Sequence, residues 1–246
     1  MDNDVDVFVD RYDQVILHPL TRAQYGDSGF YNVGDWSSAP PSAEAACTAL
    51  VDEHIRRAAL DQDGLVVLDI GCGLGDTTAR IAAAGRADLK VTGVNISDAQ
   101  VAEARKRHPD LEFQVMDATR LEFPDASVDR IIAVEAVFHF NPRTAFLDQA
   151  RRVLRPGGRV VVTDVLFTPD STPWEWWVPE VNRRLQLDDY AAQCAAHGFR
   201  VDEIEDITAQ SWTGFCTHLR ESGRVETADR IQPWVSHYLM VALTAV

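Results

Sequence analysis

One stretch decides the fold of this chain: Val66-Val67-Leu68-Asp69-Ile70-Gly71-Cys72-Gly73-Leu74-Gly75-Asp76. The apolar, β-branched run over residues 65–68 is typical of a buried strand. Three glycines at alternate positions follow it, and Asp76-Thr77-Thr78 opens a helical pattern. Glycine allows unusual backbone angles and a close approach to a ligand, and the first N–H groups of the helix point at the same place. The stretch therefore predicts a strand, a turn and a helix that together bind a small polar ligand.

The spacing of the glycines narrows the choice of ligand. Dinucleotide-binding turns favour G-x-G-x-x-G/A, with an acidic residue about 20 positions further on. Here the order is G-x-G-x-G, and Asp76 holds the place of the last glycine. Asp69, two residues before the first glycine, would repel a pyrophosphate but suits an amine or a sulfonium. A nicotinamide-dependent dehydrogenase is thus disfavoured, and so is a glycine turn that binds nothing.

The sequence Val-Leu-Asp-Ile-Gly-Cys-Gly-Leu-Gly resembles the first motif of the class I S-adenosylmethionine-dependent methyltransferases. Two further stretches, at the distances that this family shows, strengthen the resemblance. Residues 121–129, Leu-Glu-Phe-Pro-Asp-Ala-Ser-Val-Asp, are similar to a loop of ubiquinone and sterol methyltransferases. Residues 152–164, Arg-Val-Leu-Arg-Pro-Gly-Gly-Arg-Val-Val-Val-Thr-Asp, resemble the last core motif. The resemblance is clear over residues 65–207 and weaker outside them.

The composition is that of a globular protein with an acidic surface. The 246 residues include 38 acidic and 23 basic side chains, which give a formal net charge of −15. Nucleic acids and anionic membranes bind basic patches, so we expect neither as a partner. The four cysteines form no C-x-x-C pair or zinc pattern, and the acidic first residues do not open a secretory signal peptide. We expect a cytoplasmic protein with a small-molecule substrate and no metal site, and the sequence leaves a homodimer open.

Alternating strand and helix patterns predict a doubly wound parallel sheet. Strand patterns begin near residues 65, 90, 112, 130, 159, 199 and 237, with helical patterns between most of them. Right-handed crossovers place helices on both faces of such a sheet. The resemblance implies a Rossmann-like α/β fold of seven strands in the order 3-2-1-4-5-7-6, with strand 7 antiparallel. We expect this domain over residues 61–246, with substrate-binding insertions at about 166–186 and 208–232, behind an N-terminal helical lid of residues 1–60.

Polar residues follow the first four strands, and parallel strands bring their carboxyl ends to one edge of the sheet, where ligands bind. The resemblance implies S-adenosylmethionine as the cofactor and S-adenosylhomocysteine as its product. It also implies that the carboxylate of Asp117 accepts from the adenine amino group and that Glu135 lies along the methionine part. The implied cofactor-binding set is Asp69, Gly71, Cys72, Gly73, Asn95, Ile96, Gln100, Asp117, Ala118 and Glu135.

Asn95 departs from the pattern of the family, in which an Asp or Glu at the end of the second strand bonds both ribose hydroxyls. One amide oxygen accepts one hydroxyl proton, whereas the NH₂ group must donate. Residues 95–100, Asn-Ile-Ser-Asp-Ala-Gln, look like a variant in which Gln100 also reaches the cofactor. Ser97 and Gln100 equally fit a capping box for a helix over residues 98–107. Both interpretations stay open.

His139 is the candidate general base. It lies four residues past Glu135, and its ordinary pKa of about 6.5 suits proton transfer near neutrality. A base is needed only when the methyl acceptor must lose a proton; otherwise proximity and desolvation carry the reaction. Asp164, at the end of the fifth strand, is predicted to orient His139, because related natural-product methyltransferases carry a histidine and an aspartate at these places. The alternative is that His139 only lines the pocket.

Aromatic residues outside the glycine motif predict an apolar acceptor. The candidate substrate-binding residues are Tyr31, Trp36, Phe138, Trp177 and Trp212. For Tyr31 and Trp36, packing onto the core is the alternative. We expect a methyltransferase that acts on a small, largely apolar metabolite of secondary metabolism by O- or C-methylation. The rival is a cofactor-binding cyclase, or another non-methylating enzyme, on the same scaffold.

Overall fold

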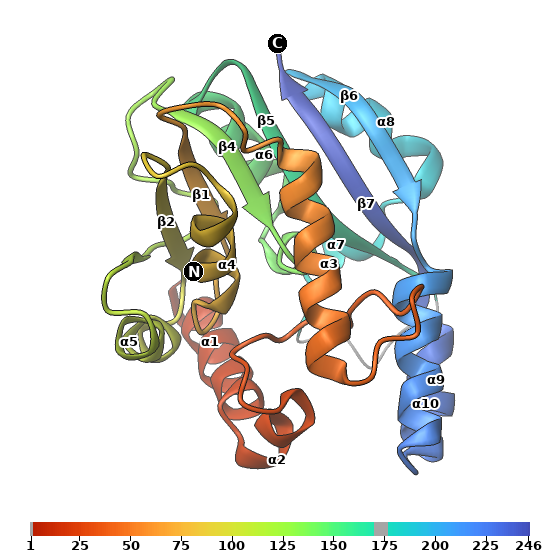
Figure 1. Cartoon of the computed structure of the whole chain (residues 1–246). Helices are drawn as coiled ribbons and strands as arrows, with labels where there is room; N and C mark the ends of the chain where they lie inside the picture. The colour runs from red at the N-terminus through yellow and green to blue at the C-terminus, as the bar shows by residue number, and fades with distance from the viewer. Residues whose placement is uncertain (1, 170–176) are drawn as a thin grey trace.

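The computed structural model describes residues 2–169 and 177–246, and it contains one seven-stranded sheet between layers of helices (Figure 1). The strand order is β3-β2-β1-β4-β5-β7-β6. β7 runs antiparallel to both of its neighbours, and the other neighbouring strands are parallel. The strands are β1 (Val66–Ile70), β2 (Lys90–Asn95), β3 (Glu112–Val115), β4 (Val128–Ala133), β5 (Leu154–Phe167), β6 (Phe199–Asp206) and β7 (Val235–Ala245). The predicted fold and strand order are confirmed.

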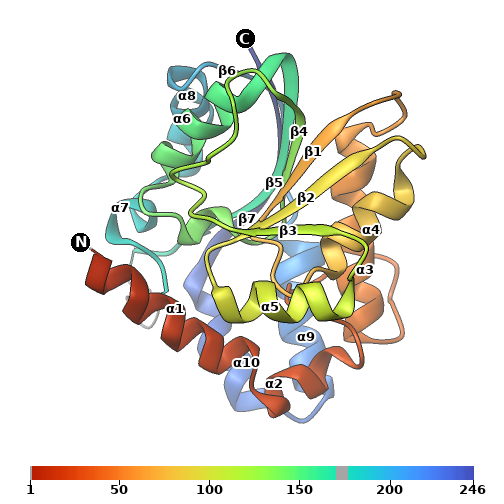
Figure 2. The same cartoon turned by 90° about the vertical axis from the view of Figure 1, so that its left-hand side faces the viewer.

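Helices cover both faces of the sheet (Figures 1 and 2). α3 (Ala43–Ala58) and α4 (Asp76–Ala84) lie on one face, and α6 (Arg143–Val153) and α8 (Leu187–Ala196) lie on the other. Successive strand residues point to opposite faces. Accordingly, Val67 belongs to the hydrophobic cluster under α3, whereas Leu68 and Ile70 belong to the cluster under α6. Because helices cover both faces of the sheet, the ends of the strands are the places where a ligand can reach it.

β5 begins earlier than the sequence predicts. Leu154 already pairs with Val128, and the register then shifts before Arg159 pairs with Arg130. The residues between the two pairings form an irregularity that contains Gly157, whose φ is 77°. A glycine at positive φ suits such an irregularity, so the strand runs through Gly157 rather than starting near residue 159.

Shorter helical segments connect the main elements. They are α2 (Pro19–Arg22), η1 (Ala23–Tyr25), η2 (Val137–His139), α7 (Glu180–Arg183), the π-helix η4 (Ala209–Thr213), α9 (Gly214–Glu221), α10 (Val225–Ile231) and η5 (Gln232–Trp234). The predicted insertion at 208–232 is therefore helical. Of the predicted insertion at 166–186, residues 170–176 lie outside the described residues.

The first helix, α1 (Asp2–Ile16), runs beside α5 (Asp98–Arg107), below the carboxyl ends of the parallel strands (Figure 2). Phe8, Tyr12 and Ile16 are spaced by four residues and therefore share one face of α1. Ile16 is buried, and Phe8 and Tyr12 contact the ring of His139. The N-terminal segment is thus packed against the edge of the sheet where a ligand is expected. Within the ranges that the structure describes, no helix has the length and apolar character needed to cross a membrane.

Candidate active site

The glycine turn between β1 and α4 leaves space at its middle glycine. Gly71, Gly73 and Gly75 have φ values of 80°, 54° and 90°, a region that side chains disfavour. A Cβ on Gly71 would lie 2.5 Å from the Cβ of Ala136, so this glycine is required by packing. A Cβ on Gly73 would meet nothing closer than Oε1 of Gln100, at 3.9 Å. The backbone at Gly73 therefore borders open space, which the backbone at Gly71 and Gly75 does not.

Asp69 joins the end of β1 to α4 through a buried hydrogen bond. Its carboxylate is 1% exposed and accepts a hydrogen bond from the hydroxyl of Thr78 in α4, at 2.6 Å. Burial raises the pKa of Asp69 to about 7. Asp69 has almost no accessible surface in this structure, and its contact with a cationic part of the ligand stays a prediction. Cys72 is buried likewise and packs with α5, so both residues hold the shape of the turn.

The end of β2 carries a hydrogen-bonded cluster that includes α1. Nδ2 of Asn95 donates to Oε1 of Gln100 at 2.9 Å, and its Oδ1 accepts from the backbone N–H of Ile96. Nε2 of Gln100 donates to Oδ1 of Asp13 at 2.6 Å, and the hydroxyl of Ser97 donates to Oδ2 at 2.7 Å. Ser97 also accepts from the backbone N–H of Gln100, so the predicted N-cap is confirmed. The side chain of Gln100 does not complete a capping box, because it binds Asn95 and Asp13 instead.

Asp117 follows β3 with one carboxylate oxygen unused. Its Oδ1 accepts from the backbone N–H and from the hydroxyl of Thr119, at 2.7 and 2.8 Å. Among the described residues, Oδ2 has no hydrogen-bond partner. Ala118 beside it is buried. The arrangement suits an acceptor for an exocyclic amino group, because the turn fixes the carboxylate while one oxygen stays available.

Glu135 follows β4 in a backbone conformation that non-glycine residues rarely adopt, with φ of 52°. Its N–H donates to the hydroxyl of Thr163 at 2.8 Å, and its Oε1 accepts from the backbone N–H of Val33 at 2.5 Å. Burial is the main cause that raises the pKa of Glu135 to about 7. Strained residues of this kind persist only where their surroundings hold them, and they concentrate at functional sites. Glu135 therefore ties the loop around Val33 to the ligand edge of the sheet.

His139 lies in η2 with a defined tautomer. Nδ1 is 2.8 Å from the carbonyl oxygen of Trp177. Because a carbonyl only accepts, Nδ1 carries the proton and Nε2 carries the lone pair. The ring is enclosed by aromatic groups, with centroid distances of 4.1 Å to Phe138, 5.2 Å to Tyr12 and 5.7 Å to Phe8. This burial lowers the pKa of His139 to about 4, so the imidazole is neutral near pH 7.

Asp164 does not orient His139, and that prediction is wrong. Its carboxylate is 0% exposed and faces Arg143, with Nη2 at 3.0 Å from Oδ1 and Nε at 2.6 Å from Oδ2. The hydroxyl of Tyr190 donates to Oδ2 at 2.9 Å. Asp164 is thus the anion of a buried ion pair. The carbonyl of Trp177, rather than Asp164, orients the ring of His139.

Asn182, which is bonded to the backbone of Arg143, supports the segment that carries His139. The backbone N–H of Arg143 donates to Oδ1 of Asn182 at 3.0 Å. Nδ2 of Asn182 donates to the carbonyl oxygens of Phe138 and Phe140, at 3.1 and 2.6 Å. Asn182 therefore fixes the backbone on both sides of His139. Sequence reasoning missed both Arg143 and Asn182, since neither stands in a recognisable motif.

Two of the five aromatic candidates contact His139, and a third contacts its neighbour Tyr12. Phe138 and Trp177 enclose its ring, and Tyr31 contacts Tyr12 edge-on at a centroid distance of 6.4 Å. Tyr12 also contacts Trp177 at 5.8 Å. Together these side chains make an aromatic wall around the ring of His139.

The other two aromatic candidates lie in packing contacts elsewhere. Trp36 stacks on His218 with a centroid distance of 4.4 Å, and its indole N–H donates to the carbonyl of Val33. Trp212 is 5% exposed and donates to the carbonyl of Gln232. For Trp36, the packing alternative therefore describes this structure better. Trp212 belongs to the core, a role that spacing along the sequence does not reveal.

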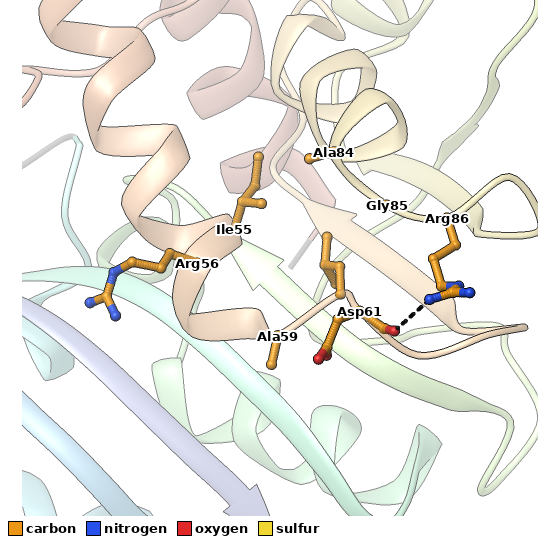
Figure 3. Close-up of a pocket in the computed structure, with 8 residues that line it drawn as sticks. Ile55, Arg56, Ala59, Asp61, Ala84, Gly85 and Arg86 are labelled. Carbon is orange, nitrogen blue, oxygen red and sulfur yellow. Dashed lines mark hydrogen bonds between the residues drawn. The ribbon is translucent and has the colours of Figure 1, made fainter.

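A surface depression lies away from these residues (Figure 3). It is lined by Ile55, Arg56, Ala59, Leu60, Asp61, Ala84, Gly85 and Arg86. Leu60 and Asp61 precede β1 and Arg86 precedes β2, so the depression is at the amino ends of the strands. Arg56 pairs with Glu53, and Arg86 pairs with Asp63. Because ligands of open α/β sheets bind at the carboxyl ends, this depression is not the active site.

Known proteins resemble the chain in sequence and in fold. A family model described as a methyltransferase domain matches residues 67–158. The 27-O-demethylrifamycin SV methyltransferase of Amycolatopsis mediterranei (strain S699) is 36% identical over 196 residues, which cover 73% of this chain and 71% of that protein. An O-methyltransferase of Pyrenophora dematioidea is 33% identical over 195 residues, which cover 73% of this chain and 72% of that protein. The solved structure of the [4+2]-cyclase SpnF matches with a TM-score of 0.78 and 21% identity over 95% of this chain and 94% of that chain, a likeness of fold alone.

Proposed function

This chain belongs to the class I S-adenosylmethionine-dependent methyltransferases, and we propose that it methylates a hydroxyl group of a largely apolar natural product, with His139 as the general base. The named relatives support the acceptor class, since one acts on a rifamycin and another is an O-methyltransferase. A cyclase is not favoured, because the similarity to SpnF is a similarity of fold at 21% identity.

The observation that carries the proposal is the tautomer of His139. The carbonyl of Trp177 fixes the proton on Nδ1, so Nε2 keeps its lone pair. Among the described residues, Nε2 has no hydrogen-bond partner. A hydroxyl that donates to this nitrogen loses its proton there as its oxygen is methylated. The low pKa keeps the ring in its neutral form at physiological pH, and it also makes Nε2 a weaker base than that of an ordinary imidazole.

The residues at the strand ends fit the cofactor. The open space at Gly73 admits a polar ligand, and the free Oδ2 of Asp117 can accept from an adenine amino group. We assign the methionine part to the neighbourhood of Glu135. This residue is next to Ala136, which lies against Gly71, and it is four residues before His139. The cofactor supplies a methyl group that is already activated on a sulfonium. The chain then has to align the acceptor with that methyl group and exclude water, which is where well-positioned groups gain most.

We propose that residues 1–60 act as a lid. α1 packs Phe8 and Tyr12 on His139, and the loop around Val33 is bonded to Glu135. In this arrangement the N-terminal segment covers the base, so it has to move before an acceptor can enter.

All four cysteines are free thiols, which fits the reducing environment of the cytoplasm.

The test is to incubate the enzyme with S-adenosylmethionine that carries an isotopically labelled methyl group and with a panel of polyketide alcohols. Each alcohol is paired with the analogue whose hydroxyl is already methylated. The proposal predicts label in a new methyl ether and none in the blocked analogue. It also predicts that His139→Gln, which keeps hydrogen bonding but cannot accept a proton, loses at least about 100-fold in kcat. Unlabelled, cyclised product, or wild-type turnover by His139→Gln, would contradict the proposal.

A further inference from the structure

The residue at the end of β2 is unsuited to bind a ribose in the usual way. Asn95 already uses its Oδ1 for the N–H of Ile96 and its Nδ2 for Gln100. An amide also lacks the negative charge that makes a carboxylate a strong acceptor for two adjacent hydroxyls. The site therefore requires another acceptor near Gln100.

Asp13 of α1 is a carboxylate at that place. It is joined to Asn95 through Gln100, by hydrogen bonds of 2.9 and 2.6 Å. The same Gln100 borders the open space at Gly73, with its Oε1 3.9 Å from the position of an added Cβ. Asp13 thus lies one side chain away from the middle of the glycine turn, on the far side of the Gln100 amide, although it is 82 residues earlier than Asn95 in the chain.

Asp13 also keeps the capacity to accept further hydrogen bonds. Each of its carboxylate oxygens accepts one hydrogen bond from the protein, from Gln100 or from Ser97. An ionised carboxylate has about four acceptor positions, so roughly two remain. The residue is half-buried rather than enclosed, so part of its surface is accessible.

The two carboxylates of the glycine turn and its helix are not available. Asp69 is 1% exposed and bonded to Thr78. Asp76 accepts from Nη2 and Nε of Arg107, at 2.8 and 2.9 Å. Asp13 is instead the carboxylate that is hydrogen-bonded to the cluster at the end of β2 and keeps acceptor positions for a neutral diol.

We propose that Asp13 is a ribose-binding residue of this enzyme, which replaces the acid that Asn95 lacks. The cofactor site is then completed by the N-terminal helix, and binding of the ribose holds α1 over the strand ends. This inference rests on the cofactor placement proposed above, and the experiment separates the two.

The experiment measures dissociation constants by calorimetry for S-adenosylhomocysteine and for its 2′-deoxyadenosyl and 3′-deoxyadenosyl analogues. The proteins are the wild type, Asp13→Asn and the matched control Asp10→Asn, which removes the same charge from an exposed position of α1. A hydrogen bond to a charged group corresponds to roughly 10- to 100-fold in affinity. We expect Asp13→Asn to lose this factor for S-adenosylhomocysteine and much less for at least one deoxy analogue, while Asp10→Asn binds all three as the wild type does.

Equal losses for all three ligands in Asp13→Asn would show that Asp13 only holds α1 in place, and would overturn the inference without touching the cofactor placement. Wild-type affinities in Asp13→Asn would overturn it too. Failure of the wild type to bind S-adenosylhomocysteine would instead contradict the cofactor placement itself. Thermal unfolding of each variant without ligand shows that a loss of affinity is not a loss of folded protein.

Discussion

Replacing Asp164 by asparagine tests the distinction between a catalytic and a structural carboxylate. Asp164 accepts from Nη2 of Arg143, from the hydroxyl of Tyr190 and from the backbone N–H of Val165, and Nε of Arg143 lies 2.6 Å away. Asp164→Asn keeps the shape of the side chain but removes the charge. It also turns an NH₂ group toward groups that donate. We therefore expect a large loss of stability and little change in the chemistry of the folded enzyme.

The magnitude follows from the burial of the pair. The side chain of Arg143 is 3% exposed and that of Asp164 is 0% exposed, so solvent does not screen the charge that remains. Breaking a buried ion pair by removing one partner costs about 3–5 kcal/mol. This is a large share of the roughly 5–15 kcal/mol by which a typical protein is stable. For a chain of this length it corresponds to a fall of roughly 6–20 °C in Tm.

The assay is equilibrium unfolding in urea, followed by circular dichroism, together with a thermal scan. The control is Asp125→Asn, since Asp125 pairs with Arg152 at 2.7 Å but its side chain is 77% exposed. An exposed pair contributes about 0–1 kcal/mol, so the control should unfold close to the wild type. The affinity of folded Asp164→Asn for S-adenosylhomocysteine should stay near that of the wild type. A loss below about 1 kcal/mol, or a stable variant with strongly reduced kcat, would refute the structural role assigned to Asp164.

Three further outcomes are expected. His139→Ala should lower kcat by roughly 10²–10⁴ without changing affinity for S-adenosylhomocysteine. The wild-type rate should fall as pH drops through about 4 rather than 6.5, because burial lowers the pKa of His139 and only the neutral ring accepts a proton. Kinetics of the wild type and of the variant over a pH series check the two expectations. Gly73→Val should abolish binding of S-adenosylhomocysteine in calorimetry, whereas Gly157→Val, which also replaces a glycine at positive φ in open space, should bind normally. Hydrogen exchange should slow in α1 and around Val33 when cofactor binds, and equal exchange in both states would count against a lid.

More of the sheet than of the candidate site could be predicted from the sequence. The strand order and the turn at Gly73 follow from local patterns and a family resemblance, because buried strands and glycines leave short-range signals. The partners of Asp164 and Trp212 could not be predicted in this way, since they come from elements far away in the chain. His139 was found by its position after β4, but its tautomer depends on the carbonyl of Trp177, which no side-chain pattern reports.

The departure at Asn95 was the one local signal that pointed to a distant residue. It showed that the usual acid was missing, but nothing in the spacing of α1 identified Asp13 as the replacement. Only the packing of α1 beside α5 brings Asp13 to Gln100. Tyr12, its neighbour, is another residue that the sequence did not single out, and it lies against the candidate base for the same reason.

A crystal structure of the complex with S-adenosylhomocysteine tests the central claim most directly, namely that the cofactor binds at the carboxyl ends of the strands beneath α1. The account predicts the ligand beside Gly73, with its adenine amino group on Asp117, its ribose within hydrogen-bond distance of Asp13, and its sulfur on the side of His139. S-adenosylhomocysteine bound instead in the depression at Arg56 and Arg86, or bound at the turn with α1 displaced and Asp13 far from the ribose, would contradict it.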